Sequence, residues 1–138
     1  MKTRILSARL LFLLLIIFFV RCTPSHQDYL SSAKEIVSTG KWSVDFYYSG
    51  QNQTSSFYNY KFSFQNNGIV VCDMGSSTVT GTWSTIHDVN SNEIMSINID
   101  CQQPNIMELN TKWNVTQLTT TEVGMQNGSN SQLRIKKI

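Results

Sequence analysis

The sequence predicts an all-β fold, namely an eight-stranded antiparallel up-and-down barrel preceded by one short helix. From residue 40 onward, apolar side chains recur at every second position, which is typical of strands with one buried face. The segments between these stretches are short and polar, so none can hold a crossover helix, and successive strands should be antiparallel neighbours. A two-sheet sandwich would satisfy the same pattern. Closure removes exposed strand edges, and we therefore favour the barrel.

The N-terminal segment is typical of an export signal. Basic residues precede an unbroken apolar run over residues 10–20, which is shorter than the roughly 20 residues that a membrane-spanning helix needs. The run ends just before Cys22, and a cysteine there resembles the lipobox of bacterial lipoproteins. We expect residues 1–21 to be cleaved as a signal peptide and Cys22 to carry a lipid. The alternative is an uncleaved anchor in which Cys22 is an ordinary thiol.

Loss of residues 1–21 would change the charge balance of the chain. Four of the eleven basic residues lie in that segment, which leaves seven against nine acidic residues, so the formal net charge falls from +2 to −2. Proteins that bind nucleic acid need clustered Lys and Arg to neutralise phosphates, and we therefore expect no nucleic-acid partner. The remaining residues suffice for one domain.

Residues 22–39 are expected to form a lipidated tether and a short helix. Ser25 begins a segment with the spacing of a helix capping box, and apolar residues follow at helical spacing. Gly40 is placed to end the helix. We expect a helix over about residues 27–38 that packs against one end of the β domain formed by residues 40–138.

The first two strands are marked by alternating aromatic side chains. Trp42 and Phe46 belong to the first strand, a polar loop covers residues 49–56, and the second strand runs over residues 58–64. The turn at residues 66–68 predicts a three-residue hairpin loop with Gly68 in the left-handed conformation. This register places Val70 opposite Phe64, Cys72 opposite Phe62 and Met74 opposite Tyr60.

The remaining strands follow at short, even spacing. They are expected at residues 70–74, 78–85, 93–101 and 107–117, with two short strands around Met125 and Leu133. An exported protein can also form a disulfide, and Cys72 with Cys101 is the candidate pair. Two unpaired inward thiols are the equally weighted alternative.

An ordered series of motifs resembles the lipocalins. Gly40-Lys41-Trp42, after a short helix and opening the first strand, resembles their G-x-W motif, and the pattern continues with Gly81-Thr82-Trp83 and ends near residue 137. With the signal segment, the chain resembles the small lipocalin-like lipoproteins of bacterial envelopes. The resemblance implies a lipid-anchored envelope protein whose barrel binds a small apolar molecule. Thr23 rather than Asp follows the lipidated cysteine, so we expect the outer membrane.

Chemistry-bearing clusters are not evident in the sequence. His26 and His87 lack the neighbours that general acid–base work or a metal site requires, so we expect no enzyme, no metal and no cofactor. A hydrolase would need a structure that brings His87 beside a hydroxyl and a carboxylate.

The apolar interior is therefore the candidate site. Barrels of eight strands are just wide enough to be filled by side chains or to hold one small ligand, and the many aromatics favour filling. A small hydrophobic molecule bound inside is the first hypothesis. A solid-core structural or protein-interaction lipoprotein, with its function on loops such as residues 49–56, is the second. The side chains expected to point inward and contact a ligand are Trp42, Phe46, Phe62, Phe64, Trp83 and Trp113.

Overall fold

The computed structural model describes residues 32–138, which form strands and three short helical segments. The elements are α2 (Ala33–Val37), β1 (Trp42–Ser49), β2 (Gln51–Asn52), η1 (Thr54–Phe57), β3 (Lys61–Phe64), β4 (Ile69–Asp73), β5 (Thr78–His87), β6 (Glu93–Ile99), α3 (Pro104–Leu109), β7 (Lys112–Leu118), β8 (Glu122–Gln126) and β9 (Gln132–Lys137).

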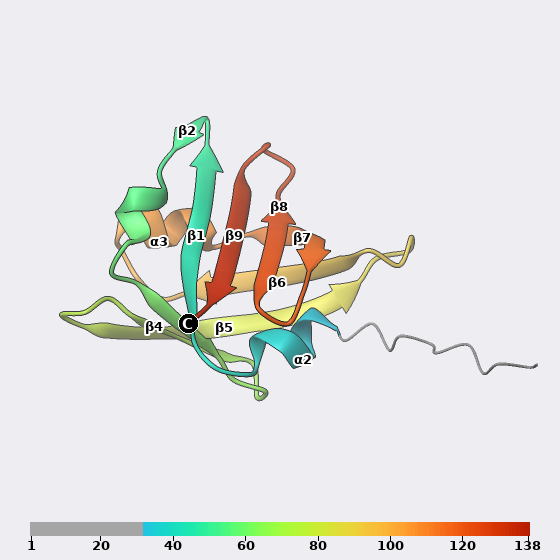
Figure 1. Ribbon diagram of the computed structural model, residues 1–138, viewed down its shortest axis with the longest axis horizontal. Helices are drawn as coiled ribbons and strands as arrows, with labels where there is room; N and C mark the ends of the chain where they lie inside the picture. Colours follow the sequence, from blue (N-terminus) through green and yellow to red (C-terminus); the bar gives the residue numbers. More distant parts are fainter. Residues whose placement is uncertain (1–31) are drawn as a thin grey trace, which may run out of the picture. The chain divides into compact units, whose positions relative to one another are not determined.

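The strands form one closed antiparallel barrel. Each of β3 to β8 pairs with the next strand along the chain, β1 pairs with β3, and β9 returns to pair with β1 (Figure 1). The two-residue strand β2 only folds back on the end of β1, so eight strands make up the wall. The predicted up-and-down barrel is confirmed.

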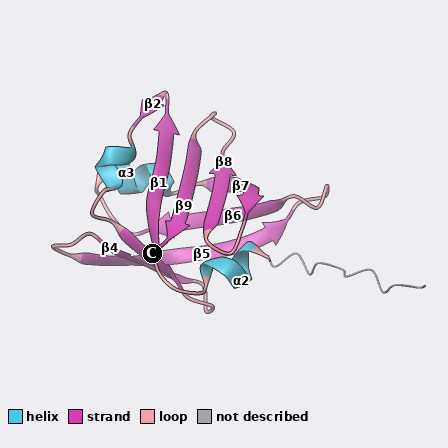
Figure 2. Ribbon diagram, in the orientation of Figure 1, coloured by secondary structure: helices cyan, strands magenta, loops and turns pink. Residues whose placement is uncertain are grey.

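The wall is uneven, because two of its seams are short. Only Trp42 and Ser43 of β1 pair with β3, and β6 meets β7 over Ile94 to Ser96 alone. Between these seams the strands divide into two groups, and Figure 2 shows β1, β9 and β8 crossing over the direction of β4, β5 and β6. The barrel therefore keeps part of the character of two sheets packed across each other.

The predicted hairpin at Gly68 and the predicted helix stop at Gly40 are both confirmed. Gly68 has a φ of +85° and the hairpin register pairs Phe64 with Val70 and Phe62 with Cys72. Gly40, with a φ of +95°, follows the helix as expected. Of the predicted helix, residues 33–37 are helical and the side chain of Ser32 caps them, whereas the expected cap at residue 25 lies outside the described residues.

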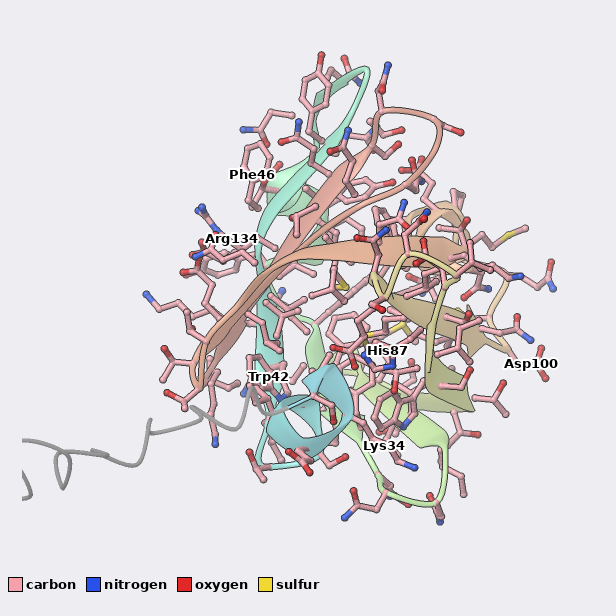
Figure 3. All side chains as sticks on the ribbon, turned by 90° about the vertical axis from the view of Figure 1, so that its right-hand side faces the viewer. Lys34, Trp42, Phe46, His87, Asp100 and Arg134 are labelled. Carbon is pink, nitrogen blue, oxygen red and sulfur yellow. The ribbon has the colours of Figure 1, made fainter. Side chains whose placement is uncertain are left out.

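Phe46 does not point into the barrel, which corrects the expected pattern of β1. The register between β1 and β9 shifts between Val44 and Phe46, so Asp45 forms a bulge and the alternation reverses. Tyr47 takes the inward position and is 1% exposed, while Phe46 lies on the outer face beside Arg134 (Figure 3).

The second strand starts later than expected. Residues 54–57 form the short helix η1, and β3 begins only at Lys61. The side chain of Asn52 accepts the amide N–H of Thr54, and the hydroxyl of Thr54 accepts the amide N–H of Tyr47. These local side-chain bonds turn the chain, so Tyr58 faces solvent and Tyr60 lies outside the strand. The pairing of β3 with β4 therefore ends at Lys61, and the predicted pair of Tyr60 with Met74 is not formed.

A helix stands where the sequence pattern predicted the start of a strand. Residues 104–109 form α3, and β7 begins at Lys112 rather than at residue 107. Pro104 occupies the first turn, where its missing N–H is not needed. Ile106 and Leu109 are buried at a spacing of three residues, so the helical period accounts for the apolar residues that alternation assigned to a strand.

Candidate functional site

The barrel interior is filled by the aromatic side chains that were expected to contact a ligand. Five of the six predicted residues lie inside, are at most 4% exposed and belong to one core cluster, and Trp83 also borders two small pockets on the barrel wall. The rings of Phe62 and Phe64 stack with centroids 6.4 Å apart, and Trp83 meets Phe64 edge-on at 5.4 Å. Phe46 alone lies outside. The filled interior agrees with the expectation from the number of aromatics.

The three tryptophans form hydrogen bonds to the segments that cover the barrel. Each indole N–H donates a hydrogen bond to a backbone carbonyl outside the strands: Trp42 to Val37 at 2.9 Å, Trp83 to Gln65 at 2.9 Å, and Trp113 to Leu109 at 3.0 Å. Buried indoles require such a partner. Consequently Trp42 holds α2, Trp83 holds the β3–β4 hairpin, and Trp113 holds α3.

The α2 end of the barrel is also held by Glu93, the first residue of β6. Both carboxylate oxygens of Glu93 accept the amide N–H of Ala33 at 2.9 Å. Ala33 and Val37 are completely buried under the short helix. The start of the described chain is thus fixed next to the β5–β6 connection.

The opposite end, where β6 finishes, is covered by α3 together with η1. The side-chain amide of Asn105 donates to the carbonyl of Ser56 at 2.9 Å, and the hydroxyl of Tyr60 donates to Gln103 at 2.7 Å. Beneath them, Phe57 packs on Tyr47 with ring centroids 5.0 Å apart. Both ends of the barrel are therefore closed.

Tyr47 lies under this cover and carries a perturbed hydroxyl. Burial, with a smaller contribution from the neighbouring carboxylate of Glu108 on α3, raises the pKa of Tyr47 to about 12. The neutral phenol is consequently the form that the folded chain stabilises.

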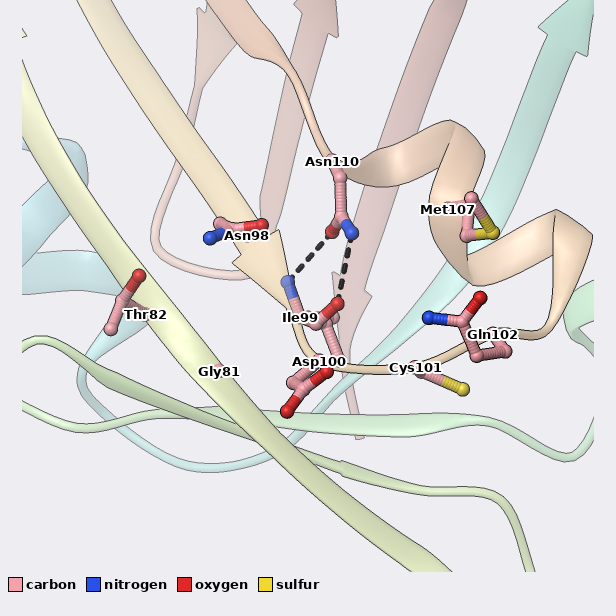
Figure 4. Close-up of a pocket in the computed structure, with 9 residues that line it drawn as sticks. All are labelled: Gly81, Thr82, Asn98, Ile99, Asp100, Cys101, Gln102, Met107 and Asn110. Atoms are coloured by element: carbon pink, nitrogen blue, oxygen red, sulfur yellow. Dashed lines mark hydrogen bonds between the residues drawn. The ribbon is translucent and has the colours of Figure 1, made fainter.

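A pocket of about 460 Å³ opens beside α3, between the helix and the neighbouring ends of β5 and β6 (Figure 4). Asn110 shapes its wall: its side-chain oxygen accepts the amide N–H of Ile99 at 2.7 Å, and its amide donates to the carbonyl of Ile99 at 2.9 Å. The side chain thereby continues the ladder of β6 where β7 no longer pairs with it. Gly81 is required opposite, because a Cβ there would overlap the backbone of Asn98 and Ile99.

The pocket combines one apolar surface with several polar groups. Met107 of α3 is half exposed and supplies the apolar surface. Amide, carboxylate, hydroxyl and thiol groups supply the rest, from Asn98, Asp100, Gln102, Asn110, Thr82 and Cys101. Such a mixture suits a small molecule with an apolar body and hydrogen-bonding substituents. Sequence reasoning missed this site because it depends on α3, which the alternation pattern concealed.

A second hollow of about 480 Å³ lies on the outer face of β7, β8, β9 and β1, around Gly124. Arg134 borders it, with its guanidinium 2.7 Å from the carboxylate of Asp45 and 5.8 Å from the ring centroid of Phe46. Glu122 lies 3.8 Å from the same guanidinium. The charges of this hollow are therefore paired with one another.

The disulfide considered for Cys72 and Cys101 is not formed, and both are free thiols. Cys72 faces the interior from β4, whereas Cys101 lies beyond the end of β6, and β5 runs between these two strands. Burial raises the pKa of the Cys72 thiol to about 12, with smaller contributions from Cys101 and Asp73.

Among residues 32–138, no group of three His, Cys, Asp or Glu side chains could hold a metal ion. His87 ends β5 next to Asp88, whose carboxylate accepts N–H groups from Asn90 and Asn92, and these bonds, led by that from the Asn92 side chain, lower the pKa of Asp88. Within the same range no helix is long and apolar enough to cross a membrane. Cys22 and His26 lie outside the described residues.

Comparison with known proteins relates this chain to solved structures through its fold. No family model and no curated protein matches the sequence. A DUF4847 family protein from Bacteroides vulgatus superposes with a TM-score of 0.56 at 15% identity, covering 76% of this chain and 96% of that one. A lipocalin-like protein from Bacteroides uniformis has a TM-score of 0.49 at 15% identity, covering 73% of this chain and 98% of that one. At such identities a likeness concerns the fold alone, and the closed eight-stranded antiparallel barrel with its short helix is the fold that this chain shares with the DUF4847 family protein.

Proposed function

We propose that this protein is a non-enzymatic envelope lipoprotein, held at the bacterial outer membrane through Cys22, that binds a small, partly apolar molecule in the pocket beside α3. The observation that carries the proposal is that the barrel interior is filled while this pocket is open. A lipocalin-like barrel with a packed interior must bind at its surface or at its ends. The pocket lies at one of these ends.

The size and chemistry of the pocket support this assignment. Its volume of about 460 Å³ lies within the range of small-molecule sites. Met107 offers an apolar contact, and the carboxylate of Asp100 and the amides around it offer hydrogen-bond partners. Because Asp100 bears the charge among the lining residues, the ligand should be neutral or cationic rather than anionic.

The packed core argues against a ligand inside the barrel. Trp113 and Tyr47 are at most 1% exposed, and their rings contact each other edge-on at 6.5 Å. A ligand in the interior would have to displace such rings, and losing the burial of one large aromatic side chain costs about 3–5 kcal/mol.

A fluorescent apolar probe tests the pocket. The exported protein carrying Cys22→Ser, which removes the acyl chains that would themselves absorb the probe, is titrated with the neutral N-phenyl-1-naphthylamine. Met107→Gln should weaken binding about tenfold, since it removes most of the apolar contact. Ile86→Gln is the matched control, because Ile86 is equally exposed but lies at the other end of β5. Equal binding by Met107→Gln and the unsubstituted pocket would contradict the proposal.

Anchoring is tested separately. Cys22→Ser should release the protein from membranes and abolish labelling by radioactive fatty acid, because the thiol is the acceptor of the lipid. Unchanged membrane fractionation would favour the alternative of an uncleaved N-terminal anchor.

A second candidate function follows from the same filled interior. A solid-core structural or protein-interaction lipoprotein needs no ligand, and its contacts would lie on loops such as residues 49–56. A native mass spectrum of the protein purified from its source distinguishes the two candidates. A mass equal to the lipidated polypeptide alone favours the second, and additional bound mass that Met107→Gln removes favours the first.

A further inference from the structure

The β5–β6 tip, defined as residues 86–92, presents apolar side chains to solvent. Val89 is 100% exposed, and Ile86 is 53% exposed. The exposure of Val89 is built into the loop: Asp88 accepts the amide N–H groups of Asn90 and Asn92, and its own N–H donates to the carbonyl of Asn92. Asp88 thus holds the backbone of the turn, and the side chain of Val89 remains fully exposed to solvent.

The tip lies beside the point at which the described chain begins. Glu93, at the base of the tip, holds the amide of Ala33 at the start of α2. Lys34 of α2 also lines a pocket of about 240 Å³ together with Ser84 and Thr85 of β5. Figure 1 shows the tip reaching out on the side where α2 begins, and Figure 3, which faces that side, labels Lys34 and His87 there.

The length of chain before α2 limits how far this end can lie from an anchor at Cys22. Nine residues lie between Cys22 and Ser32, and the ten backbone steps from one to the other span at most about 35 Å when fully extended. The start of α2 therefore stays within about 35 Å of the bilayer whenever Cys22 is lipidated. The pocket beside α3 is at the other end of β6.

We propose that the β5–β6 tip is a second membrane-contacting element, in which Val89 and Ile86 enter the bilayer interface. This inference rests on the proposed anchoring at the N-terminus. Apolar side chains on a projecting loop are stabilised when they leave water. A second membrane contact of this kind adds to the affinity that the lipid anchor provides. The amine of Lys34 would attract anionic headgroups at this end of the barrel. The carboxylate of Asp88 keeps its hydrogen bonds to Asn90 and Asn92 within the turn. Two contacts orient the barrel so that the pocket beside α3 faces away from the membrane.

Quenching by brominated lipid tests this orientation. Val89→Trp is introduced into the full membrane-bound protein, which is reconstituted in vesicles of phosphatidylethanolamine and phosphatidylglycerol with or without brominated acyl chains. The native tryptophans are at most 4% exposed and are shielded from lipid. Ser76→Trp is the matched control, because residue 76 is exposed in the turn at the opposite end of β5.

Brominated lipid should lower the added emission of Val89→Trp about twofold or more and leave that of Ser76→Trp unchanged, because bromine quenches only at the depth of the acyl chains. Equal quenching of both variants, or of neither, would overturn the proposal. Circular dichroism of the two variants should match the unsubstituted protein, since both positions are exposed. The anchoring proposal is judged independently by acyl labelling of Cys22, because a protein held by an uncleaved N-terminal segment still reports the position of the tip.

Discussion

The two ends of the barrel are closed by helices of similar length, but they differ in how many of their contacts are local. At the α2 end, the cap by Ser32, the glycine after the helix and the bond from Trp42 to Val37 join residues that are near in sequence, and the contact from Glu93 to Ala33 joins residues sixty apart. At the α3 end, the bond from Trp113 to Leu109 is local, and the bonds that attach α3 to the η1 segment join residues 43 and 49 apart. The local contacts at the α2 end predict its helix from the sequence, whereas the cover at the α3 end forms only when distant segments meet in the barrel.

The largest effect is expected from removing the tryptophan at each end. Trp113→Ala should lower the free energy of unfolding by about 3–5 kcal/mol, because it empties a completely buried site and frees the carbonyl of Leu109. Urea unfolding followed by circular dichroism measures the loss. Trp42→Ala removes an equally buried ring, so a comparable loss is expected there.

The variants Trp113→Phe and Trp42→Phe separate the hydrogen bonds from the packing. Each should lower the free energy of unfolding by about 1–2 kcal/mol in addition to the loss caused by the smaller ring, because a carbonyl loses its indole donor. If Trp113→Ala unfolds at the same urea concentration as the unsubstituted protein, the packed α3 end is not part of the core.

This contrast also explains how much of the molecule the sequence could predict. Period-two alternation and the Asn-Asn-Gly turn are local signals, and they were sufficient for the barrel and for the pairing of Phe62 with Cys72. The bulge at Asp45 could not be predicted, because it exists only against β9, which lies some ninety residues away. The inward Tyr47 and the outward Phe46 follow from that bulge.

The helix α3 did leave a signal in the sequence that alternation obscured. Pro104 followed by Ile106 and Leu109 at a spacing of three fits a short helix begun by proline. Met107 and Leu109 equally fit a strand, and the pattern alone could not decide. The pocket beside α3 could not be foreseen without that helix, since Met107 and Asn110 both derive their positions from it.

The second largest effect is expected at Asn110, which replaces a strand at the α3 end. Asn110→Ala removes both bonds to the backbone of Ile99 and should lower the free energy of unfolding by about 2 kcal/mol. Asn110→Asp keeps the acceptor but sets a carboxylate oxygen against the carbonyl of Ile99, so its loss should be at least as large. Hydrogen exchange at the amide of Ile99 should speed up in Asn110→Ala, and unchanged protection there would contradict the role of this side chain.

Alkaline pH should destabilise the same end of the molecule. The pKa of Tyr47 is raised from 10.0 to about 12, and that of Cys72 from 9.0 to about 12. A raised pKa means that the folded chain holds its proton longer than the unfolded chain. The contribution to stability is therefore complete below about pH 9 and is lost as the pH rises towards 12.

Tyr47→Phe and Cys72→Ala check this assignment. Each should flatten the decline of unfolding free energy between pH 9 and 12 by on the order of 1 kcal/mol, whatever its effect at neutral pH. Urea unfolding at a series of pH values gives the slope. A decline that is equally steep in the double variant would assign the alkaline loss to other groups.

At the α2 end, the hydrogen bonds from Ala33 to Glu93 should stabilise the docked position of α2 by about 1 kcal/mol. Glu93→Ala leaves the amide of Ala33 without its acceptor, so α2 should detach more often while the barrel remains closed. Hydrogen exchange at the indole N–H of Trp42 reports this opening through its bond to Val37. The exchange at the indole of Trp113 is the internal control and should not change, because α3 lies at the other end.

The smallest effect is expected where neither end is involved. Arg134 and Asp45 form an ion pair on the barrel wall with side chains 43% and 35% exposed, and such pairs contribute roughly 0–1 kcal/mol. Arg134→Met should therefore change the free energy of unfolding by less than about 0.5 kcal/mol, since Met keeps contact with the ring of Phe46. Added salt screens the pair, so the small difference between the two proteins should vanish in 1 M sodium chloride. A loss as large as that of Asn110→Ala would mean that the bulge at Asp45 depends on this ion pair, and the outer wall would then stabilise the barrel as much as the cover at its α3 end.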